Sequence, residues 1–167
     1  MSGNRIALRA AMPAMFAHEG WWDGWYRDVD RDGVLLDERR VRTHCEFPDA
    51  GDWHYVQHNW LTWSDGRRAT YDFGGRLEGD RIRWQTGRFD GYGWQTHEDT
   101  IMLRLDRLDV PGAYYIESIN VAPGGQRRAR TWQWFNADGP WKRTLCDEWR
   151  IQPPADSDQD RSSDTSS

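Results

Sequence analysis

Residues 53–63 alternate between two kinds of side chain, which is the spacing that separates the two faces of a β-strand. One face would carry a phenol, two amides and two apolar groups, namely Tyr55, Gln57, Asn59, Leu61 and Trp63. The other would carry His54, Val56, His58, Trp60 and Thr62. Neutral hydrogen-bonding groups beside aromatic rings suit a pocket that orients the carbonyl or hydroxyl groups of a ligand. The alternative is that the histidines face inward and the amides face water.

A second stretch, residues 126–135, would place two arginines and two tryptophans on one face, namely Arg128, Arg130, Trp132 and Trp134. An arginine inside a protein needs a carboxylate partner or an anionic ligand, because an isolated buried charge is costly. Glu117 on the preceding strand and Glu148 on the following strand are candidate partners. An Arg130–Glu148 pair would be structural, whereas a free Arg130 would hold a ligand carboxylate, and the sequence leaves both open.

Aromatic residues on other strands complete a candidate ligand-binding set. Its members are Trp22, Tyr26, Tyr55, Gln57, Asn59, Trp84, Trp94, Glu117, Arg130, Trp132, Trp134 and Glu148. If the protein is an enzyme, Tyr55, Glu117 or Arg130 would serve in proton transfer or in stabilising an oxyanion. The sequence contains no Gly-x-Ser-x-Gly elbow, no Walker A loop and no dinucleotide-binding fingerprint, so these catalytic classes are disfavoured.

Metal and cofactor sites find little support. Residues 28–33, Asp-Val-Asp-Arg-Asp-Gly, match the first half of a calcium loop, but Arg39 stands where the pattern needs a bidentate Glu. His54 and His58 would share a strand face but lie roughly 13 Å apart, too far to bind one metal together. A haem-binding barrel would need one proximal His, and no single His is distinguished. We therefore predict no metal and no cofactor.

The composition indicates one globular domain with an aromatic core. The 167 residues include 12 Trp and 6 Tyr, although the mean hydropathy is −0.97. Large rings bury much area, but so many are hard to pack densely, which leaves room for a cavity. Cys45 and Cys146 are isolated, which excludes a disulfide framework. All but one of the 22 basic residues are Arg, a bias typical of GC-rich bacterial genomes.

Charge and hydropathy also bear on partners. The net charge of −5 disfavours non-specific binding to nucleic acid. The sequence has no apolar run near the roughly 18 residues of a membrane span and no signal-peptide core. We therefore expect a cytoplasmic protein, monomer or homodimer, with no membrane and no nucleic-acid partner.

The elements that would position the candidate residues are short strands joined by turns. The aromatic stretch Gly20–Tyr26 would place Trp22, Gly24 and Tyr26 on one face, and Gly24 suits the bend that closes a sheet into a barrel. Nine strands are expected, over residues 20–28, 34–47, 53–63, 68–77, 81–89, 94–105, 113–121, 126–135 and 141–152. Their regular spacing predicts an all-β, up-and-down antiparallel barrel or sandwich.

The two ends of the chain have a different character. Pro13 favours a short helix over residues 13–19, with Met12, Met15 and Phe16 as its buried side, closing one end of a barrel. A loosely packed arm is the alternative. Residues 153–167 are rich in Ser and Asp, which predicts a disordered tail after a single domain over residues 1–152.

A short helix leading into the Gly-x-Trp sequence of Gly20-Trp21-Trp22, followed by about nine antiparallel strands, resembles the calycin superfamily. This superfamily includes lipocalins, fatty-acid-binding proteins and lipocalin-like domains of uncharacterised bacterial proteins. The resemblance implies a closed barrel with one internal pocket for a small lipophilic molecule. It also implies an Arg on a late strand that packs over the Gly-x-Trp ring, here Arg143 or Arg150. Several calycin-like barrels are enzymes, so the fold does not settle the function.

We predict that the protein binds a small hydrophobic or aromatic molecule, anionic or hydroxylated, in an internal pocket. The second hypothesis is an enzyme on the same barrel, such as an isomerase, cyclase or lyase acting on a hydrophobic substrate. The third is an interaction module that uses exposed tryptophans at a protein interface.

Overall fold

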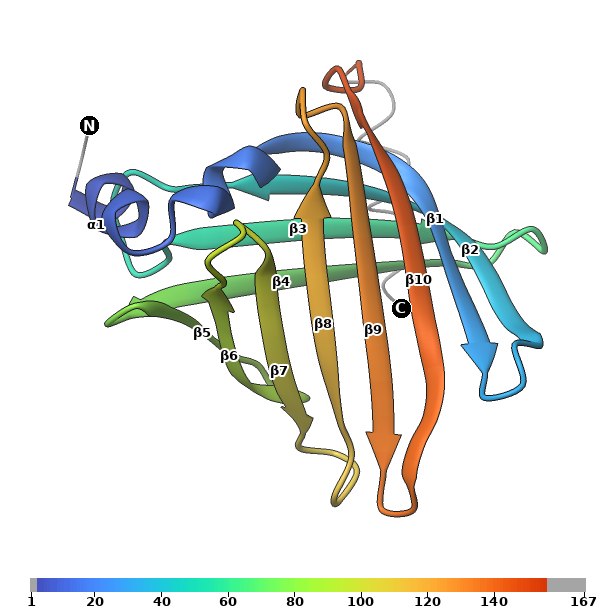
Figure 1. Cartoon of the computed structure of the whole chain (residues 1–167). Helices are drawn as coiled ribbons and strands as arrows, with labels where there is room; N and C mark the ends of the chain where they lie inside the picture. The colour runs from blue at the N-terminus through green and yellow to red at the C-terminus, as the bar shows by residue number, and fades with distance from the viewer. Residues whose placement is uncertain (1–2, 156–167) are drawn as a thin grey trace.

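The computed structural model describes residues 3–155 and shows a closed antiparallel barrel of ten strands, preceded by two helical segments (Figure 1). Each strand pairs with its neighbours in the chain, and β1 closes the barrel against β10. The helical segments are α1 (Gly3–Ala11) and the 3-10 helix η1 (Pro13–His18). The strands are β1 (Gly20–Asp30), β2 (Leu35–Glu46), β3 (Tyr55–Thr62), β4 (Arg68–Glu78), β5 (Arg81–Gln85), β6 (Phe89–Gln95), β7 (Ile101–Arg107), β8 (Tyr114–Val121), β9 (Arg127–Asn136) and β10 (Gly139–Ile151).

The predicted all-β up-and-down barrel is confirmed, with ten strands instead of about nine. The extra strand lies where residues 90–93 were expected to form a turn, because Gly91 and Gly93 belong to β6. A Cβ on Gly93 would come within 2.5 Å of the Trp84 ring, and one on Gly91 within 2.0 Å of a backbone oxygen of β7. These glycines therefore permit close packing inside the sheet, which is their other use in strands.

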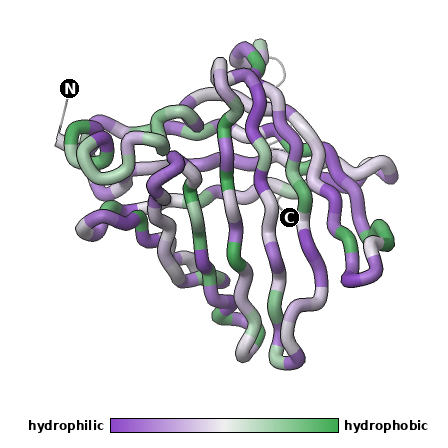
Figure 2. Tube along the Cα trace, viewed as in Figure 1, coloured by the Kyte–Doolittle hydropathy of each residue, from purple (hydrophilic) through white to green (hydrophobic). Residues whose placement is uncertain are grey.

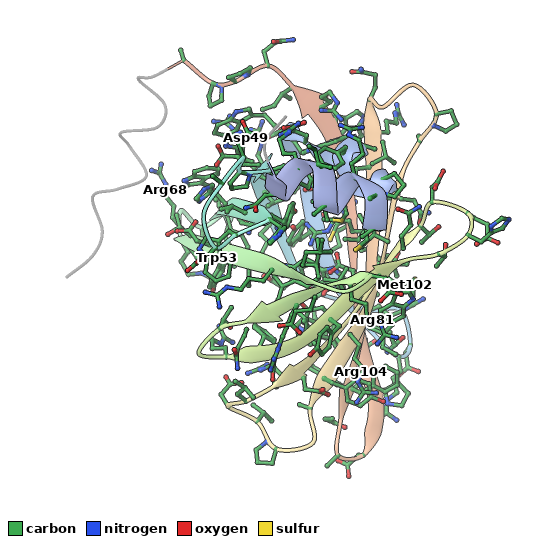
Figure 3. The ribbon with its side chains drawn as sticks, turned by 90° about the vertical axis from the view of Figure 1, so that its left-hand side faces the viewer. Asp49, Trp53, Arg68, Arg81, Met102 and Arg104 are labelled. Atoms are coloured by element: carbon green, nitrogen blue, oxygen red, sulfur yellow. The ribbon has the colours of Figure 1, made fainter. Side chains whose placement is uncertain are left out.

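The helical segments lie across one end of the barrel (Figures 1 and 3). The predicted short helix is present as η1, whereas α1 before it was not predicted. Leu8, Met12 and Met15 of this region are fully or almost fully buried. The side chain of Asn4 donates hydrogen bonds to carbonyls of the β2–β3 connection, and the amide of Ala14 donates to the Gln95 side chain of β6. These contacts fix the segments on the barrel.

Trp22 is the centre of the closed end. It is fully buried, and its indole N–H donates to the carbonyl of His18 at 2.8 Å. The guanidinium groups of Arg150 and Arg128 lie over the ring, at 4.2 and 4.7 Å from its centroid. Of the two arginines expected over this ring, Arg150 is therefore the one that occupies the position. It also donates to the carbonyls of Ala17, Glu19 and Gly125, which ties the helical segment to the barrel wall.

Three further observations concern the strand faces, the helices and the C-terminal residues. Figure 2 shows hydrophilic and hydrophobic positions interleaved along the strands, as expected when one strand face is interior and the other exterior. No helix in residues 3–155 is long and apolar enough to span a membrane. The predicted tail begins at residue 153, and its residues 156–167 lie outside the described part of the chain.

Candidate functional site

An internal cavity of about 370 Å³ extends from η1 towards the opposite end of the barrel, where the β1–β2 and β9–β10 hairpins lie. Met15 and His18 line its inner end, and Lys142 and the partly exposed Trp141 line its mouth. Its size is in the range of small-molecule pockets. Nine of the twelve predicted site residues line it, namely Tyr26, Tyr55, Gln57, Asn59, Trp84, Glu117, Arg130, Trp132 and Trp134.

The other three predicted residues do not line the cavity. Trp22 and Glu148 are buried behind its inner end. Trp94 was expected to face the cavity as the first residue of a strand, but it lies near the end of β6, which begins at Phe89. A Cβ on Gly93 would point at Trp84, a cavity residue, so Trp94 points to the outside of the barrel, beside Met102 of β7.

Arg128 and Glu148 form a fully satisfied ion pair at the closed end. Nε and Nη2 of Arg128 donate to the two carboxylate oxygens at 2.7 and 2.8 Å, and the Thr43 hydroxyl lies 3.1 Å from Oε1. Burial raises the pKa of the Glu148 carboxyl, but the charges of Arg128 and Arg130 outweigh it, so the pKa is lowered overall. The pair is bidentate, and both residues are 3% exposed or less. The Arg128–Glu148 pair therefore has a structural role at the closed end of the barrel.

Arg130 and Glu117 form a second ion pair, which is open to the cavity. Nε of Arg130 donates to Oε1 of Glu117 at 2.6 Å, and Nη1 donates to the Tyr26 hydroxyl at 2.7 Å. Within residues 3–155, neither Oε2 of Glu117 nor Nη2 of Arg130 makes a hydrogen bond. The alternative of an Arg130–Glu148 pair is wrong, because Glu148 is already bound by Arg128. The other candidate, Glu117, is the partner of Arg130 and keeps one carboxylate oxygen free within the described residues.

The inward face of β3 carries a ladder of polar groups that satisfy one another. Tyr55 donates to Oε1 of Gln57 at 2.6 Å, Gln57 donates to Oδ1 of Asn59 at 2.7 Å, and Asn59 donates to the carbonyl of Tyr71 on β4. Burial raises the pKa of Tyr55 well above its usual value, so its hydroxyl stays protonated. The histidines of β3 lie on the other face, where His58 contacts Asp72 at 2.7 Å. The amides therefore face the cavity, and the alternative of inward histidines is wrong.

The mouth of the cavity is lined by basic side chains that the sequence pattern did not single out. They are Arg39, Arg88, Arg107 and Lys142. Asp109 accepts from Arg107, Asp37 from Arg39, and Asp28 from Lys142, at 2.6 to 2.8 Å. These aspartates do not line the cavity. Including Arg128 and Arg130, six cationic side chains line the cavity and Glu117 is the one carboxylate among them, in a chain of net charge −5.

Incorrect strand limits account for two of these misses. Arg88 was placed in a strand over residues 81–89 but lies between β5 and β6, and Arg107 is the last residue of β7, which was expected to end at residue 105. Alternation assigns faces only where the strand limits are correct. Arg39 and Lys142 lie inside expected strands, but charged residues are mostly exposed, so their types did not mark them as inward. Among the described residues, no group of three or more His, Cys, Asp or Glu could hold a metal ion.

Comparisons with known proteins identify the fold. No family model matches the sequence, and no curated protein matches it. The S-type phycobiliprotein lyase CPES from Guillardia theta superposes with a TM-score of 0.67 at 12% identity, over 84% of this chain and 92% of that one. A DUF3598-family protein of unknown function from Nostoc punctiforme gives a TM-score of 0.63 at 16% identity. That match covers 82% of this chain, which spans about half (49%) of the Nostoc protein. At these identities the likeness shows the shared barrel fold alone.

Proposed function

We propose that this chain is a calycin-like barrel that binds a small amphipathic molecule, with an aromatic or conjugated body inside the cavity and an acidic group at the mouth. The observation that carries the proposal is the charge of the cavity wall. Six cationic side chains line it with one carboxylate, although the chain as a whole is acidic. Counter-ions that lie behind the basic groups leave their cavity side free to attract an anion.

The ion pairs decide where the acidic group binds. Arg130 was the expected anchor for a ligand carboxylate, but it already holds Glu117, and a second carboxylate there would repel the first. Lys142 and Arg88 at the mouth are better placed, because their partners Asp28 and Asp109, unlike Glu117, do not line the cavity. Lys142 lies 5.1 and 4.9 Å from the ring centroids of Trp134 and Trp141, so an anion near it would also contact aromatic rings.

The walls suit a flat apolar body. Trp84, Tyr115, Trp132 and Trp134 line the cavity, and the last three form contacting ring pairs at 4.6 to 5.9 Å. The indole N–H of Trp132 is buried without an acceptor in the described part of the chain. Because the neighbouring rings hold each other, these walls lose little conformational entropy when a ligand binds, which favours affinity.

A matched pair of fluorescent probes tests the proposal. Anilinonaphthalene sulfonate and N-phenylnaphthylamine share the same rings, and only the first carries an anion. We expect the sulfonate to bind at micromolar concentration and more tightly than the neutral amine. Lys142→Met and Arg88→Met should each weaken the sulfonate by about ten-fold, roughly 1.4 kcal/mol, and leave the neutral probe unchanged. Arg104→Met is the control, since Arg104 is an exposed residue outside the cavity lining. Equal affinity for both probes, or no binding, would refute the proposal.

A lyase, isomerase or cyclase on this barrel is the second candidate function. It is favoured by the free oxygen of Glu117 at the cavity wall, where a carboxylate could accept a proton from a bound substrate. Of the other predicted catalytic residues, Tyr55 donates a hydrogen bond to Gln57, and Arg130 donates one to Glu117. Native mass spectrometry of the wild-type protein and of Glu117→Gln, each purified from its own host, would separate the functions. An enzyme should carry product in the wild type and substrate in the variant, whereas a binding protein should carry the same compound in both.

A further inference from the structure

His18 is a buried histidine whose side chain makes no hydrogen bond within the described residues. It is the last residue of η1, is 4% exposed and lines the inner end of the cavity. Its carbonyl accepts the hydrogen bond from Trp22, which fixes the backbone. Neither ring nitrogen makes a hydrogen bond within residues 3–155, and neither is among the fully enclosed unpaired atoms of that range. The imidazole therefore lines the cavity with ring nitrogens that no other described residue engages.

The surroundings of His18 keep it uncharged. Burial lowers its pKa well below the usual value, and the nearby positive charges of Arg128, Arg130 and Arg150 lower it further. A neutral imidazole offers one N–H donor and one nitrogen acceptor. The three arginines are themselves engaged, Arg128 with Glu148, Arg130 with Glu117, and Arg150 with backbone carbonyls. They set the charge state of His18 without occupying its hydrogen-bonding positions.

The free groups of the second ion pair face the same cavity. Oε2 of Glu117 is an acceptor without a donor, and Nη2 of Arg130 is a donor without an acceptor, in the part of the chain that the structure describes. Tyr115 also lines the cavity and makes no hydrogen bond through its hydroxyl among these residues. Donors and acceptors are thus both available in the inner part of the cavity. The charges of Arg130 and Glu117 balance each other there, and His18 is uncharged.

We infer that the inner part of the cavity is a second recognition site, in which His18, Glu117 and Arg130 bind an uncharged group that both donates and accepts hydrogen bonds, such as a phenolic hydroxyl or a cyclic amide. The inference rests on the proposed function and extends it. The ligand class becomes an aromatic molecule with an acid at one end and a neutral polar group at the other. A ligand without that group would displace water from these polar atoms and leave them unpaired, which is how a polar site rejects apolar analogues.

Two rod-shaped probes test this inference, namely biphenyl carboxylic acid with the acid in the para position and its analogue with a para hydroxyl at the far end. Calorimetry should show that the wild-type protein binds the hydroxylated acid about ten-fold more tightly, the value of one good hydrogen bond. His18→Leu should abolish this preference, and His18→Gln, which keeps a donor and an acceptor, should retain part of it. Arg104→Met, a change of an exposed residue outside the cavity lining, is the control and should retain all of it.

The outcomes separate the inference from the proposal on which it rests. Lys142→Met should weaken both acids by the same factor, because it acts at the mouth. If the methyl esters bind as well as the acids, the anionic mouth fails, and the hydroxyl preference measured on the esters still tests the inner site. No preference for the hydroxyl in the wild-type protein would overturn the inference. So would a preference that survives in both His18→Leu and Glu117→Gln, with melting temperature confirming that each variant is folded.

Discussion

The two ion pairs should differ sharply in their effect on stability, although both join a glutamate and an arginine on neighbouring strands. In Glu148→Gln, Arg128 would lose the carboxylate that accepts two of its three hydrogen bonds, while it remains 3% exposed beside Arg130. Breaking a buried pair from one side costs about 3–5 kcal/mol, because the remaining charge is uncompensated. In Glu117→Gln, Arg130 loses one hydrogen bond at a cavity wall that water can reach. That loss should cost about 1.5–3 kcal/mol, the value of one hydrogen bond to a charged group.

The free energy of unfolding can be measured by urea titration at neutral pH, with tryptophan fluorescence and circular dichroism as independent probes. We expect Glu148→Gln to be less stable than Glu117→Gln by roughly 2 kcal/mol. We also expect Glu117→Gln to lose the hydroxyl preference and to keep the affinity for the simple acid. The same loss of stability in both variants would show that the Arg130–Glu117 pair is as structural as the other. The reverse order would refute our distinction between a closed and an open pair.

Three further outcomes follow from the structure. Trp22→Ala should lower the free energy of unfolding by about 3–5 kcal/mol, since the ring is fully buried. The loss should be smaller in Trp21→Ala, because the Trp21 ring stacks on His44 on the outside of the barrel. Equal losses in urea titrations would contradict this expectation. Because the pKa of His18 is lowered in the folded protein, folding favours the neutral imidazole. The contribution of this preference to the free energy of unfolding is complete above the unfolded pKa of about 6.5 and is lost as the pH falls below that value. Between about pH 7 and 5.5 the wild type should therefore lose up to ~1.3 kcal/mol more than His18→Gln, and parallel pH profiles would exclude a buried neutral imidazole. Removal of residues 153–167 should shift the melting temperature by less than about 4 °C, and a larger fall would mean that the tail is part of the domain.

The sequence was informative where a strand continued regularly. Alternation placed Tyr55, Gln57 and Asn59 on one face of β3, and Arg130 and Trp132 on one face of β9, as the structure has them. Side-chain alternation has a period of two and needs only the correct strand limits. It failed for Trp94, because Gly91 and Gly93 were interpreted as a turn when they are the places where Trp84 and a neighbouring strand pack closely.

The partners of the arginines could not be predicted, because they depend on register. Arg128 stands directly opposite Glu148 across β9 and β10, after an irregularity between Pro140 and Lys142 shifts the pairing by one residue. Without that shift Arg127, an exposed residue, would face Glu148, and the buried ion pair would not form. A turn sequence does not reveal such a bulge. The sequence interpretation therefore named both glutamates as candidate partners, but it could not assign Glu117 to Arg130 and Glu148 to Arg128.

The closed end also explains why the barrel can hold a cavity at all. A sequence poor in aliphatic residues cannot fill a ten-stranded barrel with closely packed apolar side chains. Here the cross-section beside η1 is filled by Trp22, with two guanidinium groups over its ring, and by the Arg128–Glu148 pair. Backbone carbonyls accept hydrogen bonds from the other guanidinium group, that of Arg150. Because hydrogen bonds fix this layer, the residues above it need not pack against one another, and their free polar atoms can remain in the wall. The feature that stabilises one end of the barrel is thus the one that leaves Glu117, Arg130 and His18 available to a ligand.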